Sequence, residues 1–279
     1  DYAVPYHVQF LRTRKWFPSA KMVMLKLLEF FFKVNPRLSK FDLLWCADEA
    51  MFPFIWFSGV KTKIWDLHEL PELLMRNQWT RKLFHHLERK CTLIIHANQA
   101  RLNYLIEQGM ILQPDKHRVI NNLPDREFLA SEENPEFSGR LKTWLGGADY
   151  IYCQGLNGAG RYPYNTLAAI LKATELKVVI VGRKEEPAIA ALREEFGGET
   201  IEHRCFFTGM LPQLQTPILI RNAYTSLIFY RTTSMNGRFC EANRFYQPLA
   251  FGVPVICGNN PPMKDIVQQF NCGVALNSD

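Results

Sequence analysis

A glycine-rich segment in the second half of the chain has the composition of a phosphate-binding turn. Residues 155–161 (Gly-Leu-Asn-Gly-Ala-Gly-Arg) follow an apolar run typical of a buried strand and precede a helical pattern. Glycines let backbone N–H groups approach a phosphate, and Arg161 adds a cation with bidentate reach. The Gly-Lys-Ser/Thr ending of an ATPase loop is absent. Gly155 and Arg161 are therefore candidate phosphate ligands, and an ordinary tight turn is the alternative.

A second cationic site is predicted in residues 240–256. This segment starts with Glu241, Asn243 and Arg244, continues as a helical pattern and ends in a Gly-x-Pro stop before an apolar strand. The free N–H groups and positive dipole end of such a helix suit a phosphate or a sugar hydroxyl. Gln247 lies one turn onward on the same face and keeps one acceptor oxygen for a diol. A capped buried helix is the alternative.

A histidine flanked by carboxylates follows a predicted strand in the first half. Residues 65–72 read Trp-Asp-Leu-His-Glu-Leu-Pro-Glu. Open α/β sheets bind ligands at the carboxyl ends of their strands, and a carboxylate can fix the tautomer of a histidine ring. His68, Asp66 and Glu69 are therefore the candidate catalytic residues. The alternative is a helix start in which the carboxylates cap N–H groups.

Two further strand ends carry weaker candidates. Arg183 follows the apolar run 177–181 and could meet a phosphate or belong to a solvated helix start. Met210 and Leu211 follow Gly209, which permits close backbone approach to a flat base. The remaining histidines show no metal-ligand spacing, so no metal site is predicted.

Two series of alternating strands and helices position these candidates. Strands are predicted at 41–46, 63–67 and 91–96, before a run at 118–120 that leads into Asn121, and again at 150–154, 177–181, 205–208, 226–230, 253–257 and 273–276. Helices are predicted between them, including 212–222, for which a break at Pro217 is the alternative. This order predicts an α/β fold with two Rossmann-like domains, each built on a parallel sheet. The predicted domains are 1–124 and 148–279, joined by a segment at 125–147 that is predicted to be a linker plus a short helix, with ligands in a cleft between the domains.

Composition fits a globular intracellular protein. The chain has 279 residues, of which 47% are hydrophobic, enough for two packed domains. Its seven cysteines form no Cys-x-x-Cys pair, which favours a reduced cytoplasmic compartment. The first residues do not form a signal peptide, and no apolar run approaches the length of a membrane span.

The basic charge is concentrated near the start of the chain. Residues 1–40 contain eight Lys and Arg and two acidic residues, so this segment accounts for the net charge of +6. Large aromatic residues lie among these cations, which suits peripheral contact with an anionic membrane surface. An ordinary core helix at 19–34 is the alternative. No nucleic-acid-binding motif accompanies the charge.

Four motifs together resemble GT-B glycosyltransferases of the family-4 type. They occur in the order Asp-x-His-Glu at 66–69, Asn-x-Pro at 122–124, Gln-Gly at 154–155 followed by Arg161, and Asn-Arg at 243–244 followed by Gly-x-Pro-Val-Ile at 252–256. The resemblance covers roughly residues 41–279. Gln247 occupies the position of the family's Glu, and Tyr162 replaces a Gly after Arg161.

The resemblance implies an enzyme that moves a sugar from a UDP- or GDP-linked donor to a hydroxyl acceptor, without a further cofactor. In such enzymes the first domain binds the acceptor and the second the nucleotide. Arg161 and Arg244 would grip the diphosphate, the main chain at Met210 and Leu211 would meet the base, and His68 would lie against the donor sugar. The family's first strand and last helices have no counterpart here, so a fold truncated at both ends is expected. The acceptor is lipid-linked if the membrane interpretation holds.

Three other functions remain open. A sugar-nucleotide epimerase or hydrolase can use the same scaffold. A non-catalytic relative that binds a partner enzyme is favoured by Gln247 in place of Glu. A nicotinamide-dependent enzyme is disfavoured, because no acidic residue follows a proper fingerprint at the usual spacing.

Overall fold

The computed structural model describes residues 23–132, 135–156, 158 and 161–277. The chain divides into two compact units, Asp1–Ile120 and Asn121–Asp279. Trp16, Phe17, Lys15 and Lys21, which belong to the predicted basic segment, lie outside the described residues.

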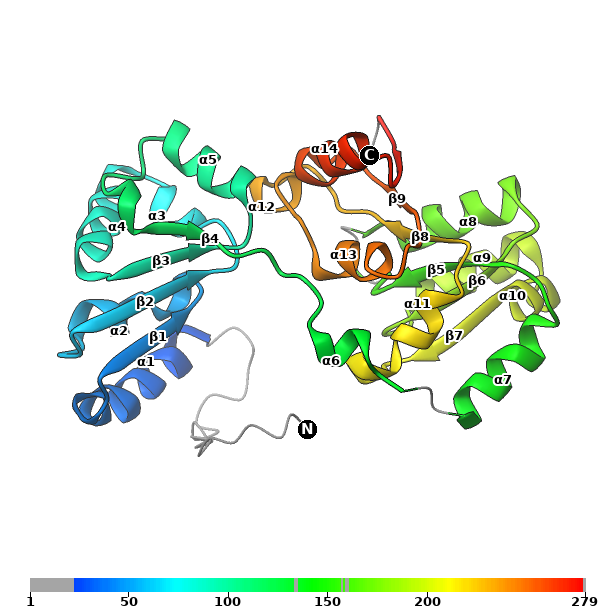
Figure 1. Cartoon of the computed structure of the whole chain (residues 1–279), viewed down its shortest axis with the longest axis horizontal. Helices are drawn as coiled ribbons and strands as arrows, with labels where there is room; N and C mark the ends of the chain where they lie inside the picture. Colours follow the sequence, from blue (N-terminus) through cyan, green and yellow to red (C-terminus); the bar gives the residue numbers. More distant parts are fainter. Residues whose placement is uncertain (1–22, 133–134, 157, 159–160, 278–279) are drawn as a thin grey trace. The chain divides into compact units, whose positions relative to one another are not determined.

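The first unit is built on a four-stranded parallel sheet in the order β1-β2-β3-β4 (Figure 1). Its strands are β1 (Leu43–Ala47), β2 (Thr62–Leu67), β3 (Leu93–His96) and β4 (His117–Val119). The register pairs Ala47 with Asp66 and Leu67 with His96. The carboxyl ends of β1, β2 and β3 therefore lie level, and residues that follow them gather at one edge of the sheet.

Helices and 3-10 turns connect these strands as the alternation predicts. They are α1 (Val23–Val34), η2 (Asn35–Lys40), η3 (Glu49–Met51), α2 (Phe52–Phe57), α3 (Glu72–Met75), α4 (Gln78–Lys90), α5 (Gln99–Glu107) and η4 (Pro114–Lys116). Asn77 accepts hydrogen bonds from two backbone N–H groups at the start of α4. The fully buried Trp65 of β2 packs on Phe84 of α4, with ring centroids 5.4 Å apart. This packing fixes β2, which carries the histidine motif.

The second unit contains a six-stranded parallel sheet in the order β10-β9-β8-β5-β6-β7. Its strands are β5 (Tyr150–Gln154), β6 (Lys177–Val181), β7 (Cys205–Gly209), β8 (Thr225–Ile228), β9 (Val255–Cys257) and β10 (Gly273–Ala275). From β5 the sheet continues through β6 and β7 on one side and through β8, β9 and β10 on the other. The order therefore reverses between β5 and β8, which is where doubly wound sheets bind their ligands.

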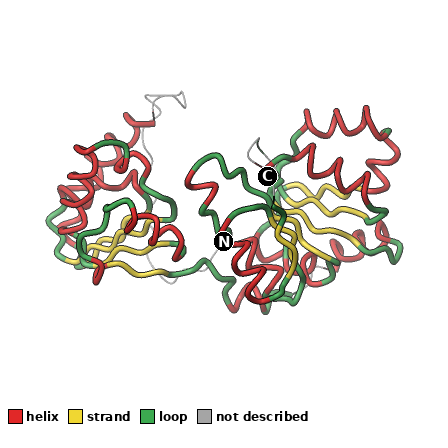
Figure 2. Tube along the Cα trace, turned by 90° about the horizontal axis from the view of Figure 1, so that it is seen from above, coloured by secondary structure: helices red, strands yellow, loops and turns green. Residues whose placement is uncertain are grey.

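Helices cover both faces of this sheet, as the fully buried β6 requires (Figures 1 and 2). One face packs against α8 (Pro163–Ala173), α9 (Glu186–Phe196) and α10 (Gly198–Arg204). The other packs against α6 (Arg126–Leu129), α7 (Pro135–Leu145) and α11 (Pro217–Arg221), which follows η6 (Gln213–Gln215). Near β8 and β9 the core includes α13 (Asn243–Leu249) and α14 (Pro261–Phe270). The remaining short helix is α12 (Met235–Arg238).

The segment 125–147, predicted as a linker plus a short helix, contains two helices, α6 and α7. Their side chains Phe128 and Leu141 are 1% and 4% exposed, so the segment packs in the core of the second unit. Asp125 caps α6 by accepting a hydrogen bond from the N–H of Phe128. The Asn-Pro and Gly-Gly pairs that indicated a linker instead separate or end short helices, because apolar side chains between them reach the sheet.

The helix of the second cationic segment begins at Asn243 rather than at Glu241. Gly252 has a φ of +73° and ends the helical segment before β9, as the Gly-x-Pro sequence predicts. Within the residues that the structure describes, no helix has both the length and the apolarity to cross a lipid bilayer.

Candidate functional site

Three neighbouring strands of the second unit end in glycines with positive φ. Gly155, Gly182 and Gly209 follow or end β5, β6 and β7, with φ of +62°, +127° and +74°. The Gly155 N–H donates to the Val181 carbonyl at 2.6 Å, and the Gly182 N–H donates to the Gly209 carbonyl at 2.9 Å. A Cβ on Gly182 would lie 3.3 Å from the Cα of Gly155. Glycine is therefore needed at position 182, and the lack of side chains at these three glycines lets a ligand approach the backbone at this edge of the sheet.

Arg161 and Arg244 converge on the first of these glycines. Arg161 Nη1 donates to the Gly155 carbonyl at 2.6 Å, and Arg244 Nη1 donates to the same oxygen at 3.1 Å. Arg244 Nη1 also donates to the Gln154 carbonyl. The two guanidinium groups, 83 positions apart in sequence (244 minus 161), thus meet beside the reversal point of the sheet. The structure brings together the two residues that sequence reasoning chose independently.

The ring of Tyr230, which sequence analysis missed, lies beside both arginines. Its centroid is 4.5 Å from Arg244 Cζ and 5.4 Å from Arg161 Cζ. Burial lowers the pKa of Arg244, Tyr230 opposes this shift, and the neighbouring Arg161 cation adds to it. Arg244 remains charged, since guanidinium pKa values lie far above neutrality. Its Nε and Nη2 are shielded from solvent without a hydrogen-bond partner, which leaves donors for an anion.

The other residues of the 240–256 segment take different positions. Glu241 accepts hydrogen bonds from Tyr246 Oη and from Asn121 Nδ2, the latter at 2.7 Å. Its carboxylate is therefore engaged within the unit. Asn243 is exposed at the start of α13. Gln247 is only 3% exposed, and its Oε1 has no hydrogen-bond partner in the protein. An acceptor therefore remains at the position where the resembling family has Glu.

The candidates on β6 and β7 lie at the same sheet edge as Gly155. Arg183 directly follows Gly182 and is exposed. Met210 follows Gly209 and is 77% exposed, whereas Leu211 packs against the core that contains α6, α7 and α11. A main-chain role for Met210 and Leu211 stays a prediction.

In the first unit, His68 lies between two carboxylates. Its Nε2 is 3.1 Å from Asp66 Oδ2, and its Nδ1 is 4.0 Å from Asp48 Oδ1. The backbone oxygen of His68 accepts a hydrogen bond from the buried Arg101. His68 itself is half exposed, while Glu69 is exposed. An accessible imidazole held by carboxylates can exchange a proton with a ligand.

Asp48 is a further candidate that sequence reasoning did not select. It follows β1 and has a φ of +61° and a ψ of 170°, a backbone conformation that residues other than glycine rarely adopt. Its N–H donates to the Asp66 carbonyl at 2.8 Å, and its carbonyl accepts from Trp65 Nε1 at 3.0 Å. The available signal was an acidic residue close to the carboxyl end of a predicted strand, where open α/β sheets bind ligands.

Two histidines that the sequence did not connect, His96 and His117, belong to a buried chain of hydrogen bonds. His96 Nε2 lies 2.8 Å from His117 Nδ1, and His117 Nε2 lies 3.1 Å from Glu88 Oε1. Glu88 also accepts from the N–H groups of Leu112 and Gln113, each at 2.9 Å. Burial raises the pKa of Glu88, but these hydrogen bonds outweigh it and the net direction is down. Burial lowers the pKa of His96 to about 3.

The buried hydrogen bonds of His96, His117 and Glu88 predict that the folding stability of the protein decreases in acid. His96 stays neutral when folded but takes up a proton below about pH 6.5 when unfolded, so its contribution to stability falls as pH drops toward 3. Between pH 7 and pH 5 we expect a loss of about 2 kcal/mol, measured as the free energy of unfolding in urea. His96→Gln should flatten this dependence, while the exposed His203→Gln should leave it unchanged. Parallel curves for wild type and His96→Gln would contradict the assignment.

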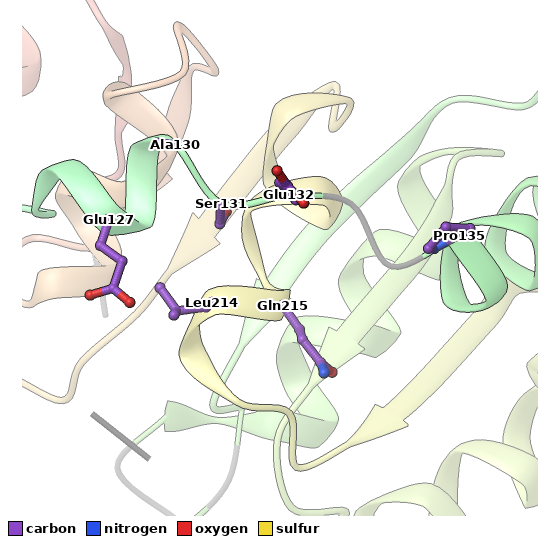
Figure 3. Close-up of a pocket in the computed structure, with 7 residues that line it drawn as sticks. All are labelled: Glu127, Ala130, Ser131, Glu132, Pro135, Leu214 and Gln215. Atoms are coloured by element: carbon purple, nitrogen blue, oxygen red, sulfur yellow. The ribbon is translucent and has the colours of Figure 1, made fainter. Parts of the chain in front are cut away.

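A hollow of about 650 Å³ lies elsewhere in the second unit, between α6, η6 and the start of α7 (Figure 3). Figure 3 labels its lining residues, namely Glu127, Ala130, Ser131, Glu132, Pro135, Leu214 and Gln215. It contains no cationic side chain, and its two carboxylates would repel a diphosphate. Arg161 and Arg244 therefore remain the predicted anion ligands. In the part of the chain that the structure describes, no group of His, Cys, Asp or Glu side chains could hold a metal ion.

Comparison with solved structures identifies the fold. Anabaena HepE in complex with UDP and glucose is 15% identical with a TM-score of 0.67, over 93% of this chain and 70% of HepE. Sucrose-phosphate synthase from Thermosynechococcus elongatus is 12% identical with a TM-score of 0.69, over 92% of this chain and 66% of that chain. A UDP-forming α,α-trehalose-phosphate synthase from Burkholderia xenovorans is 10% identical with a TM-score of 0.63, over 87% and 65%.

These neighbours are GT-B glycosyltransferases, and the chain has the GT-B fold that the sequence predicted. No protein-family model matches the chain, and no significant similarity to a curated protein is found. The chain spans about two thirds of the length of these neighbours.

Proposed function

We propose that this protein transfers a sugar from a nucleotide diphosphate sugar to a hydroxyl acceptor. The observation that carries the proposal is the convergence of Arg161 and Arg244 on Gly155, beside the reversal point of a parallel sheet in a GT-B fold. That HepE was solved with UDP and with UDP-glucose supports a nucleotide sugar as the donor.

The proposed reaction breaks the bond between the sugar's anomeric carbon and the diphosphate oxygen. A bond from the same carbon to the acceptor oxygen replaces it, and the acceptor hydroxyl gives its proton to a base, the role proposed below for His68. The electron pair of the broken bond stays on the diphosphate, so negative charge grows there. Arg161 and the unpaired donors of Arg244 stabilise that charge. These residues require no further cofactor for this role.

We assign the acceptor-side chemistry to the first unit. His68, held by Asp66 and Asp48, is the group there that could exchange a proton with a hydroxyl or hydrogen-bond to the sugar. In the second unit the buried Oε1 of Gln247 provides a single acceptor for a ribose hydroxyl. The donor base and sugar are left to experiment.

The test begins with thermal denaturation in the presence of UDP, GDP, ADP and CMP. A nucleotide that binds the folded state raises the melting temperature by mass action. The corresponding nucleotide sugar is then supplied with and without hydroxyl acceptors, and the products are analysed. Release of free sugar without an acceptor identifies a hydrolase, and an isomerised donor an epimerase. Failure of every nucleotide to bind would overturn the proposal and favour a non-catalytic relative.

We further propose that the protein works at the cytoplasmic face of a membrane on a lipid-linked acceptor. The helix α1 exposes Leu25, Leu28 and Phe32 at helical spacing, with exposed fractions of 40%, 49% and 70%. Phe31 joins this stripe to the 61% exposed Phe57, since its ring contacts both Phe32 and Phe57. The stripe lies within the basic part of the sequence. Apolar side chains among cations favour an anionic bilayer surface.

Vesicle binding checks this contact. The double variant Leu28→Ser/Phe32→Ser should bind phosphatidylserine vesicles at least about tenfold more weakly, because it loses the apolar area that would enter the lipid interface. Phe270→Ser in α14, where Phe270 is 65% exposed, is the matched control and should bind like wild type. Equal binding by both variants would refute this surface as the membrane contact.

A further inference from the structure

The positive charges of Arg161 and Arg244 lie close together in the second unit and repel each other. Arg161 and Arg244 both donate to the Gly155 carbonyl, so their guanidinium groups share one acceptor. Peptide carbonyls carry only partial negative charge, and the neighbouring Arg161 cation lowers the pKa of Arg244. A group in contact with both guanidinium groups would give a reason for the two cations to stay together.

Tyr230 supplies that reason. Its ring centroid lies 4.5 Å from one guanidinium carbon and 5.4 Å from the other, within the range of cation–π attraction. Such a contact is stronger where the cation is shielded from water, as Arg244 is. Burial raises the pKa of Tyr230, so the phenol stays neutral near pH 7, and a hydrogen bond between the Tyr230 and Arg244 side chains adds to the ring contacts.

The position of the ring is itself constrained. Tyr230 comes two residues after the end of β8, at the reversal point of the sheet, and packs against the core formed with α13 and α14. Asn260 Nδ2 donates to the Gly237 carbonyl at 2.7 Å and lies 3.5 Å from the Tyr230 carbonyl. The amide of this fully buried Asn260 thereby ties the segment after Tyr230 to the start of α14.

We propose that Tyr230 is a positioning residue for the diphosphate site. It would hold Arg161 and Arg244 in one arrangement before a ligand arrives, with Nε and Nη2 of Arg244 still available to phosphate oxygens. Preorganisation reduces the side-chain entropy lost on binding, so its removal weakens binding without removing a ligand contact. The inference rests on the proposed function, because it takes the diphosphate as the ligand.

Calorimetry with UDP and UMP on full-length variants tests the inference. Tyr230→Phe keeps the ring and should bind UDP within about threefold of wild type, whereas Tyr230→Leu should bind about tenfold more weakly or worse. The loss should be larger for UDP than for UMP, because the second phosphate depends most on paired cations. Loss of a purely structural contact would weaken both nucleotides alike. Tyr230→Met serves if the leucine variant does not fold.

A double-mutant cycle decides whether Tyr230 acts through the arginines. In an Arg161→Gln background, Tyr230→Leu should weaken UDP binding by only a few-fold, because one of its two cations is already gone. An equal loss in both backgrounds, or unchanged UDP affinity in a folded Tyr230→Leu protein, would overturn this inference alone. Failure of wild type to bind any nucleotide diphosphate would instead overturn the proposed function.

Discussion

Arg244→Ala is expected to abolish the rise in melting temperature that UDP or another bound nucleoside diphosphate causes. The substitution removes a cation with two unpaired, shielded donors at the sheet's reversal point. Charge-assisted bidentate contacts to phosphate contribute several kcal/mol, so we expect a loss of affinity of at least about 100-fold. Arg244→Lys should restore part of the affinity, because it keeps the charge but loses the planar fork.

The substitution also affects the protein without its ligand. The carbonyls of Gln154 and Gly155 lose donors, so a small decrease in the ligand-free melting temperature is expected. Arg193→Ala on α9 is the matched control, since Arg193 is half exposed and pairs with Glu202 at only 3.8 Å. It should leave the nucleotide response unchanged. An Arg244→Ala protein that still responds fully to the nucleotide would refute the anion site.

His68→Ala is expected to lower kcat by about 10²- to 10⁴-fold, the range typical of a lost acid–base group. The measurement is release of the nucleoside diphosphate from the nucleotide sugar that the thermal screen identifies. Affinity for the free nucleoside diphosphate should change little, because the proposed phosphate ligands belong to the other unit. The mutation should therefore separate catalysis from nucleotide binding.

Two companion variants refine that result. Asp48→Asn keeps the shape of the side chain but removes its charge, and the 4.0 Å distance to His68 predicts a smaller loss, on the order of tenfold. The exposed His203→Ala is the control and should be fully active. If His68→Ala retains wild-type kcat, the histidine motif is a structural helix start rather than a catalytic site.

Much of the fold was predictable because apolar runs and helix-breaking residues in the sequence indicate strands and helix ends locally. The run Lys177–Val181 has five consecutive buried residues, and β6 has these bounds in the structure. A strand whose sheet is covered by helices on both faces needs such a buried run. The break at Pro217 was predicted because proline has no N–H and fits the first turn of a helix, where α11 begins. Alternating strands and helices likewise imply parallel sheets.

Other features depended on which distant residues meet. The segment 125–147 has the composition of a linker, yet Phe128 and Leu141 find an apolar sheet face formed by residues later in the chain. His96 and His117 become part of a chain with Glu88 because β3 and β4 pair while α4 packs beside them. No local pattern in the sequence specifies these contacts.

By itself, the sequence determined the two series of strands and helices, the glycines at strand ends and the residue types able to bind phosphate. These depend on backbone preferences and on hydrophobic periodicity, which act over a few neighbouring residues. Only the tertiary structure placed Tyr230 beside Arg161 and Arg244, and Asp48 beside His68. The order of the strands determines these contacts, because it brings the ends of strands that are distant in sequence to the same edge of a sheet.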